Sequence, residues 1–206
     1  MNIIGVDPSI DSTGICCLKD GEDPIYYLIV SSNKYKSKKM QEFIKTFDHD
    51  RLHIRFYHRC DVSWTPYTLT DYSLKEYLKT TDFNVICNHL KDIIQETSSE
   101  LAFIEGISYG SAGHVVDLAG LNYLMRKTVI SCNVMECIIA PTENKKIATG
   151  NGAAKKEEMI YAWHACDDIW KDIDKRIKTD DLADAYFLAH NYDYWQRLAK
   201  TKQEIV

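Results

Sequence analysis

The order of the strand and helix patterns constrains the fold of this chain more than any other feature. Three short apolar runs joined by tight turns come first, which predicts three consecutive antiparallel strands. These runs are residues 3–6, 14–18 and 25–30. From about residue 80 helical and strand patterns alternate, as in βαβ units. The alternating segments are a helix at 82–96, a strand at 101–104, a helix at 114–131 and a strand at 134–139. We therefore predict an α/β fold with one mixed β-sheet flanked by helices.

The middle and the end of the chain add further elements. Apolar residues with helical spacing follow Ser37, and the alternation at residues 52–56 predicts another strand. A Gly-containing, Lys-rich loop is expected before a helix at 154–164, and a final helix is expected over 181–198. The sequence holds no internal repeat, low-complexity tract or Pro/Gly/Ser-rich linker, so we expect residues 1–206 to form a single domain.

The composition excludes several classes of protein. Hydrophobic residues make up 45% and charged residues 27%, as in ordinary globular proteins, and no apolar run approaches the ~18 residues of a membrane span. The first residues lack the pattern of a signal peptide. The seven cysteines are odd in number and scattered, which favours reduced thiols over a disulfide framework. We expect a cytoplasmic protein without a membrane partner.

The charge pattern leaves the question of a nucleic-acid partner open. The net charge of −5 argues against a protein that coats nucleic acid by bulk charge alone. Residues 31–60 nevertheless carry eight basic and three acidic residues, and basic pairs stand at 145–146 and 155–156. A solvated charged face explains such clusters as well as a binding surface does.

Four carboxylates stand where predicted strands end or the last predicted helix begins. Asp7 ends the first strand, and Glu105 directly follows the strand at 101–104. Asp181 and Asp184 open the last helix three positions apart, so both side chains point to the same face of it. Strand ends and helix starts converge at one edge of the sheet in α/β folds. The pattern therefore predicts that the four carboxylates meet.

Four carboxylates in one place repel each other unless cations neutralise them. Oxygen ligands of this kind suit Mg²⁺ or Mn²⁺. Two such ions ~3.5–4 Å apart can clamp the attacking and leaving oxygens of a displacement at phosphorus, so phosphodiester cleavage is the expected chemistry. Asp180 adjoins Asp181 and exchanges roles with it if the helix begins one residue earlier, but the Asp-x-x-Asp spacing favours Asp181.

Four segments, in order along the chain, carry a family resemblance. They are IIGVDPSIDSTG at 3–14, FIEG at 103–106, the stretch from Lys145 through GNG to Lys156, and DDLADAYFLA at 180–189. Together they resemble the RuvC family of Holliday-junction resolvases, within the RNase H-like nuclease superfamily. The resemblance implies an RNase H-like sheet with metal-binding and catalytic carboxylates at Asp7, Glu105, Asp181 and Asp184.

The resemblance also implies an activity and its partners. It implies a crossover junction endonuclease that binds branched DNA as a homodimer and makes paired nicks with 5′-phosphate ends. Each active site would hold two Mg²⁺ ions, for which Mn²⁺ can substitute. Lys145 or Lys156 would offset charge on the phosphate, and the pairs Lys145/Lys146 and Lys155/Lys156 would contact DNA. The helix at 114–131 corresponds to the dimer-forming helix of the family, with an ordinary core-facing helix as the alternative.

Two features go beyond the family pattern or leave it open. Tyr109 is a candidate aromatic wedge that stacks on a base at the junction, with a plain loop tyrosine as the alternative. Residues 20–81 are longer and more aromatic than the family core needs, which predicts an inserted or elaborated region at about 32–80. Its basic excess would widen the DNA footprint or engage a partner.

The expected function has alternatives, because a fold and its acids fix the chemistry but not the substrate. One is an RNase H-like nuclease for another DNA substrate, such as a flap, a mismatch or a packaging intermediate. The other is a non-catalytic subunit that grips junctions. We expect the protein to act in the cytoplasm of a bacterium or of a phage- or virus-infected host cell.

Overall fold

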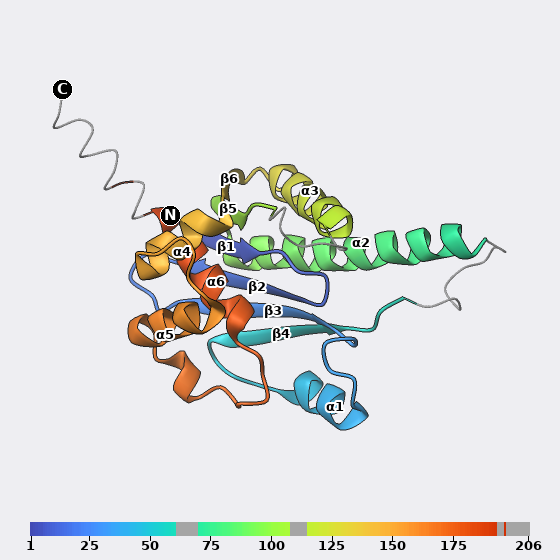
Figure 1. The fold of residues 1–206 in the computed structure, drawn as a ribbon, viewed down its shortest axis with the longest axis horizontal. Coiled ribbons are helices and arrows are strands. Elements are labelled where there is room, and N and C mark those ends of the chain that lie inside the picture. Colours follow the sequence, from blue (N-terminus) through green and yellow to red (C-terminus); the bar gives the residue numbers. More distant parts are fainter. Residues whose placement is uncertain (61–69, 108–114, 193–195, 197–206) are drawn as a thin grey trace.

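One mixed sheet of six strands organises the molecule (Figure 1). The computed structural model describes residues 1–60, 70–107, 115–192 and 196. The strands are β1 (Ile3–Asp7), β2 (Ser12–Leu18), β3 (Ile25–Ser31), β4 (Leu52–Tyr57), β5 (Leu101–Glu105) and β6 (Met135–Ile139). Their order across the sheet is β4-β3-β2-β1-β5-β6. The first three strands form the predicted antiparallel meander, whereas β5 and β6 run parallel to β1, and β4 runs parallel to β3.

Helices cover both faces of this sheet. They are α1 (Lys38–Thr46), α2 (Asp71–Thr97), α3 (Val115–Ser131), α4 (Pro141–Thr149), α5 (Lys156–Cys166) and α6 (Asp180–Ala189), with a short 3₁₀ turn at Ile169–Lys171. Helices α2 and α3 pack on one face, and α1, α5 and α6 pack on the other. The prediction of a mixed β-sheet flanked by helices in a single domain is confirmed.

The central strands are apolar on both faces because both faces are covered. Ile4 and Val6 of β1 pack toward α2 and α3. Cys16 and Leu28, on the neighbouring strands, pack toward α5 and α6. Since strand side chains alternate between faces, the third, fifth and seventh residues of the chain share the α6 face. Asp7 is thereby directed toward α6.

Two glycines let α6 lie against the backbone of the sheet. A Cβ atom on Gly5 of β1 would lie 2.2 Å from the carbonyl oxygen of Ala185, and one on Gly14 of β2 would lie 2.1 Å from that of Asp181. Real Cβ atoms do not approach backbone atoms so closely, so any larger residue would push the helix away. The backbone of α6 can approach the sheet this closely only because these two side chains are absent.

Several predicted boundaries are wrong for local reasons. The helix expected at 82–96 begins at Asp71, where the Thr70 hydroxyl accepts from the Ser73 backbone N–H and caps it. The first turns of α2 project beyond the sheet and bury no side chain before Asp82, which is why apolar periodicity did not predict them (Figure 1).

The C-terminal boundaries differ as well. The last helix, expected over 181–198, is interrupted: α6 ends at Ala189, where the His190 backbone N–H turns back to the carbonyl of Tyr186, and described residues 191, 192 and 196 are again helical. Lys145, expected in a loop, lies in α4, which Pro141 starts and Gly150 ends with φ 79°. Proline at the first helical position and glycine after the last are the usual signals for such a helix.

The region expected to be inserted, at about 32–80, contributes α1, β4 and the start of α2. β4 joins the sheet as an edge strand through its register with β3, from Tyr26 opposite Leu52 to Ser31 opposite Tyr57. All seven cysteines are free thiols. In the part of the chain that the structure describes, no helix has the length and apolar character needed to cross a membrane.

The close approach of α6 predicts a clear effect of a single methyl group. Gly14→Ala should lower the free energy of unfolding by about 1–3 kcal/mol, because the new methyl group overlaps the Asp181 backbone. The same change at Gly120, in α3, meets only the Phe83 ring at 3.5 Å and should raise stability by about 0.5–1 kcal/mol. Urea unfolding of both variants measures this, and equal effects would contradict the packing argument.

Candidate active site

The four predicted carboxylates meet at one end of the sheet. Asp7 is the last residue of β1 and Glu105 the last of β5, and these strands are parallel neighbours with Val6 opposite Ile104. The two acidic side chains therefore sit side by side on the α6 face. Asp7 is also paired with Gly14 of β2, over which the first turn of α6 passes. That turn carries Asp181, and Asp184 follows one turn later.

Burial and mutual repulsion raise the pKa of each of these carboxyls. Burial, followed by the charges of Glu105, Asp184 and Asp181, raises the pKa of Asp7 well above its usual range. Burial and the charge of Asp184 raise the pKa of Glu105 to about 7. Burial and the charge of Asp181 raise the pKa of Asp184 to about 6. The four groups thus form one electrostatic unit rather than four separate surface acids.

The fourth acid belongs to the same unit. The pKa of Asp181 is also raised, first by burial and then by the charge of Asp180. Burial therefore disfavours the charged form of all four acids, and a positive charge beside them would offset that cost.

The donor chemistry of this cluster fits Mg²⁺ or Mn²⁺. Hard divalent cations prefer carboxylate oxygens, and the buried negative charge needs compensation. As they stand, however, no three Asp, Glu, His or Cys side chains within the described residues are arranged to hold one metal ion. The ammonium groups of two lysines lie against the acids at the start of α6.

Two of the predicted lysines lie beside the carboxylates. Lys156, at the start of α5, forms an ion pair with Asp180 and lowers the pKa of Asp7 and of Asp184. Burial raises the pKa of Asp180, but the Lys156 ammonium outweighs that effect and holds it below the usual range. Lys145 of α4 lowers the pKa of Glu105 and of Asp184. Asp180 is thus the ion-pair partner of Lys156, whereas the charge of Asp181 raises the pKa of Asp7.

The remaining predicted contact residues are not brought to the carboxylates. Lys146 and Lys155 are exposed, and within the described residues no hydrogen bond or ion pair joins them to the four acids. The reason is helical geometry, because Lys146 follows Lys145 by one position in α4 and so points about 100° away from it. Tyr109 lies outside the residues that the structure describes.

Three residues at the site were not predicted from the sequence. The Lys34 Nζ atom, from the connection between β3 and α1, lies 3.2 Å from Asp181 Oδ2. Asn122 of α3 donates from Nδ2 to the Glu105 carbonyl at 2.8 Å, and Asn144 of α4 donates from Nδ2 to the Asp184 carbonyl at 3.1 Å. A buried asparagine inside a helix is the only sequence signal these amides give, since asparagine is a poor helix former.

Each of the two asparagines holds the backbone of one of the four acids. Asn122 links α3 to the end of β5, directly at Glu105. Asn144 links α4 to α6 at Asp184, and it stands next to Lys145. Both amides are buried, so each hydrogen bond is made away from competing water.

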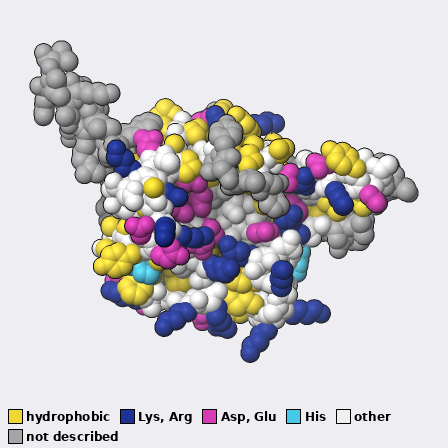
Figure 2. Space-filling view, in the orientation of Figure 1, with side chains coloured by type: hydrophobic (Ala, Val, Ile, Leu, Met, Phe, Trp, Pro, Cys, Tyr) yellow, Lys and Arg dark blue, Asp and Glu magenta, His cyan; other side chains and the backbone are white. Residues whose placement is uncertain are grey.

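The surface around the site combines both signs of charge. Figure 2 shows acidic side chains gathered over the region of α6, with Lys and Arg side chains directly beside them. A cluster of negative charge bordered by cations suits a polyanion that approaches together with divalent cations.

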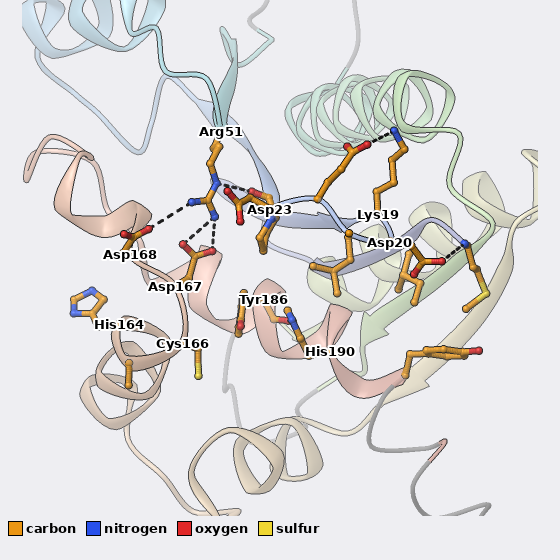
Figure 3. A pocket seen from close by; sticks show the side chains of 18 of the residues that line it. Lys19, Asp20, Asp23, Arg51, His164, Cys166, Asp167, Asp168, Tyr186 and His190 are labelled. Atoms are coloured by element: carbon orange, nitrogen blue, oxygen red, sulfur yellow. Dashed lines mark hydrogen bonds and ion pairs between the residues drawn. The ribbon is translucent and has the colours of Figure 1, made fainter.

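A separate cavity of about 610 Å³ lies at the opposite end of the sheet (Figure 3). Arg51 points toward Asp167 and Asp168 there, with Nη2 2.7 Å from Asp167 Oδ2. Lys19 pairs with Glu22 on the same rim. Arg51 and Lys19 are thus both paired with neighbouring acids at this cavity.

Comparison with solved structures identifies the fold. Thermus thermophilus RuvC matches with a TM-score of 0.55 and 14% identity, over 97% of each chain. T. thermophilus RuvC in complex with Holliday junction substrate matches with a TM-score of 0.60 and 13% identity, over 97% of this chain and 96% of that one. The yeast mitochondrial Holliday junction resolvase Ydc2 matches with a TM-score of 0.53 and 13% identity, over 98% and 82%.

These likenesses show that the chain has the RuvC fold, as the sequence motifs predicted. No protein-family model matches the sequence, and no curated protein matches it either.

The raised pKa values predict how stability depends on pH. The ordinary pKa of a glutamate here is 4.5 and that of folded Glu105 is about 7, so the folded state binds more protons than the unfolded state between these pH values. Stability should therefore fall as pH rises through this window. Glu105→Gln should be more stable than the wild type at pH 8, by roughly 1–3 kcal/mol, and should show a shallower decline.

Urea unfolding at intervals between pH 4.5 and pH 8 measures this dependence. Glu157→Gln, an exposed position on α5, is the matched control and should stay within about 0.5 kcal/mol of the wild type. A Glu105→Gln protein with the same decline as the wild type would show that Glu105 carries no electrostatic penalty.

Proposed function

We propose that this protein is a divalent-metal-dependent endonuclease that resolves four-way DNA junctions by paired nicks with 5′-phosphate ends. The observation that carries the proposal is the meeting of Asp7, Glu105 and the first turns of α6 at one end of a RuvC fold. A structure with that fold is described in complex with a Holliday junction substrate. The fold by itself would allow other substrates, so the acids and the neighbouring cations supply the chemical part of the argument.

Asp7, Glu105, Asp181 and Asp184 would hold the cations, with Mg²⁺ as the expected metal and two ions in each site. Bound there, these ions would activate a water and stabilise the oxygen that leaves phosphorus. The protein itself supplies a fixed position for each acid. Asn122 holds the end of β5 at Glu105, and Asn144 holds α6 at Asp184.

Lys145 and Lys156 would place positive charge beside the phosphate during cleavage. Both already act on the carboxylates, since they lower the pKa of Asp184 from two different helices. Lys146, Lys155 and Tyr109 are proposed to contact DNA away from the reacting phosphate. Lys146 is exposed on α4 and Lys155 is exposed directly before α5, as such contacts require.

We also propose that the protein works as a homodimer through the outer face of α3. Residues spaced along one face of this helix, Val116, Gly120, Tyr123, Lys127 and Ile130, are exposed. The exposed fractions of Val116, Tyr123 and Ile130 are 83%, 60% and 57%, which is high for apolar side chains. Ile138 of the edge strand β6 lies on the α3 side of the sheet and is also exposed. A second copy suits this face because a four-way junction has two-fold symmetry and paired nicks need two active sites.

Junction cleavage tests the proposed function. The wild type should nick a synthetic four-way junction symmetrically in Mg²⁺ or Mn²⁺ and should be inactive in EDTA. Asp7→Asn should lose at least about 100-fold in rate, more than is typical for groups one step removed from a metal. The measurement is single-turnover cleavage of end-labelled junctions beside linear, flap and mismatch duplexes.

Asp20→Asn is the control, because Asp20 is an exposed acid in the turn at the opposite end of the sheet. It should cut at the wild-type rate. If the protein cuts a flap or a mismatch instead of the junction, the proposed active site would stand but the proposed substrate would be wrong. Tight junction binding without cleavage in either metal would mean that the protein is a non-catalytic binding subunit.

A charge on the α3 face tests the dimer. Tyr123→Glu should weaken self-association at least about tenfold, because a buried unpaired carboxylate opposes association. Tyr161→Glu, on another exposed tyrosine, in α5, should associate like the wild type. Sedimentation of all three proteins over a range of concentrations compares them, and a wild type that stays monomeric throughout would refute the proposed dimer.

A further inference from the structure

Lys34 holds an unusual position for a lysine. Its side chain is only 18% exposed, and its Nζ atom lies 3.2 Å from Oδ2 of Asp181, whose side chain is 12% exposed. It lowers the pKa of Asp181 and of Asp180, although burial and Asp180 leave the pKa of Asp181 raised overall. The Lys34 ammonium group thus forms an ion pair with one of the carboxylates that we propose bind cations.

The backbone around Lys34 is fixed from several directions. The Gln41 side chain donates to the carbonyls of Ser32 and Tyr35 at 3.2 and 2.9 Å. The buried Tyr35 hydroxyl accepts from the Lys178 backbone N–H at 3.1 Å, two residues before α6 begins. The turn that carries Lys34 is therefore tied to the start of α6, and Lys34 is not a chance surface contact.

The same connection continues as a basic surface. Lys36, Lys38 and Lys39 follow Lys34 within five positions and are exposed. A lysine has a long flexible stem, so its ammonium group can leave one anionic partner for another without a movement of the backbone. A phosphate chain that lies along these lysines would offer Lys34 such a partner.

Electrostatics makes the Lys34 ammonium and a divalent cation competitors at Asp181. Both neutralise the same carboxylate, and like charges in one buried place repel each other strongly. The Lys34 ammonium already lies against Asp181 Oδ2, and the Lys156 ammonium lies against the neighbouring Asp180. Cation binding and the Lys34–Asp181 ion pair should therefore exclude each other.

We propose that Lys34 is a built-in counter-ion. Its ammonium group neutralises Asp181 in the free protein and moves to pair with a DNA phosphate when divalent cations bind. This inference rests on the proposed function, and it adds a residue to the site from a region that the sequence motifs do not cover. It assigns the connection between β3 and α1 a direct part in coupling metal binding to DNA binding.

Two binding measurements on the full chain test the proposal. Lys34→Met should bind Mg²⁺ or Mn²⁺ about tenfold more tightly than the wild type in calorimetric titrations without DNA, because a competing charge is gone. In Ca²⁺, used as a cation expected not to support cleavage, the same variant should bind the four-way junction more weakly. Its plot of log affinity against log salt concentration should be shallower by about 0.9, the slope of one phosphate contact.

Two further variants keep the test interpretable. Lys34→Arg retains the charge and should stay close to the wild type in cation affinity. Lys19→Met removes one positive charge at the opposite end of the sheet and should change neither measurement. If Lys34→Met does not fold, Lys34→Gln replaces it, and urea unfolding checks each protein.

The outcomes separate this inference from the proposed function. Unchanged or weaker cation binding by Lys34→Met would overturn the inference while junction cleavage by the wild type still stood. Tighter cation binding in a protein that neither binds nor cuts junctions would support the counter-ion role and refute the proposed substrate. No cation binding by either protein would refute both.

Discussion

The close approach of α6 to the backbone of β1 and β2 is the contact on which the rest of the structure depends. Gly5 and Gly14 permit it, since a side chain at either position would overlap the helix backbone. Because of this approach, the first turn of α6 lies over the end of β1, where Asp7 stands. The glycines thus determine, through packing alone, that acids separated by more than half of the chain become neighbours.

Bringing acids together in a buried place opposes folding, and the surrounding chain limits that opposition. Lysines from three different segments, Lys34, Lys145 and Lys156, face the carboxylates. The charge that remains uncompensated raises the pKa values of the acids. In the proposed function the same charge would attract cations, so stability at neutral pH and affinity for metal would be opposed properties of the same residues.

Much of the fold follows from patterns that act over short distances. Strand alternation and turn residues predicted all six strands, and the carboxylates at strand ends and helix starts predicted where the site lies. Errors arose where local signals are weak. The first turns of α2 bury nothing, so apolar periodicity could not predict them, and the helical assignment of Lys145 depended on Pro141 and Gly150 rather than on periodicity. Lys34 gave no signal, because an isolated lysine between two elements resembles any other surface lysine.

The sequence by itself determined which segments are strands and helices, which acids stand at their ends, and the motifs typical of the RuvC fold. Only the tertiary structure decided that β4 adds to the sheet beside β3, that Asn122 and Asn144 hold the backbone at Glu105 and Asp184, and that Lys34 reaches Asp181. The physical reason is the separation along the chain of the residues that interact. Periodicity and capping depend on residues a few positions apart, whereas these contacts join residues brought together by packing across 17 to 147 positions of the chain.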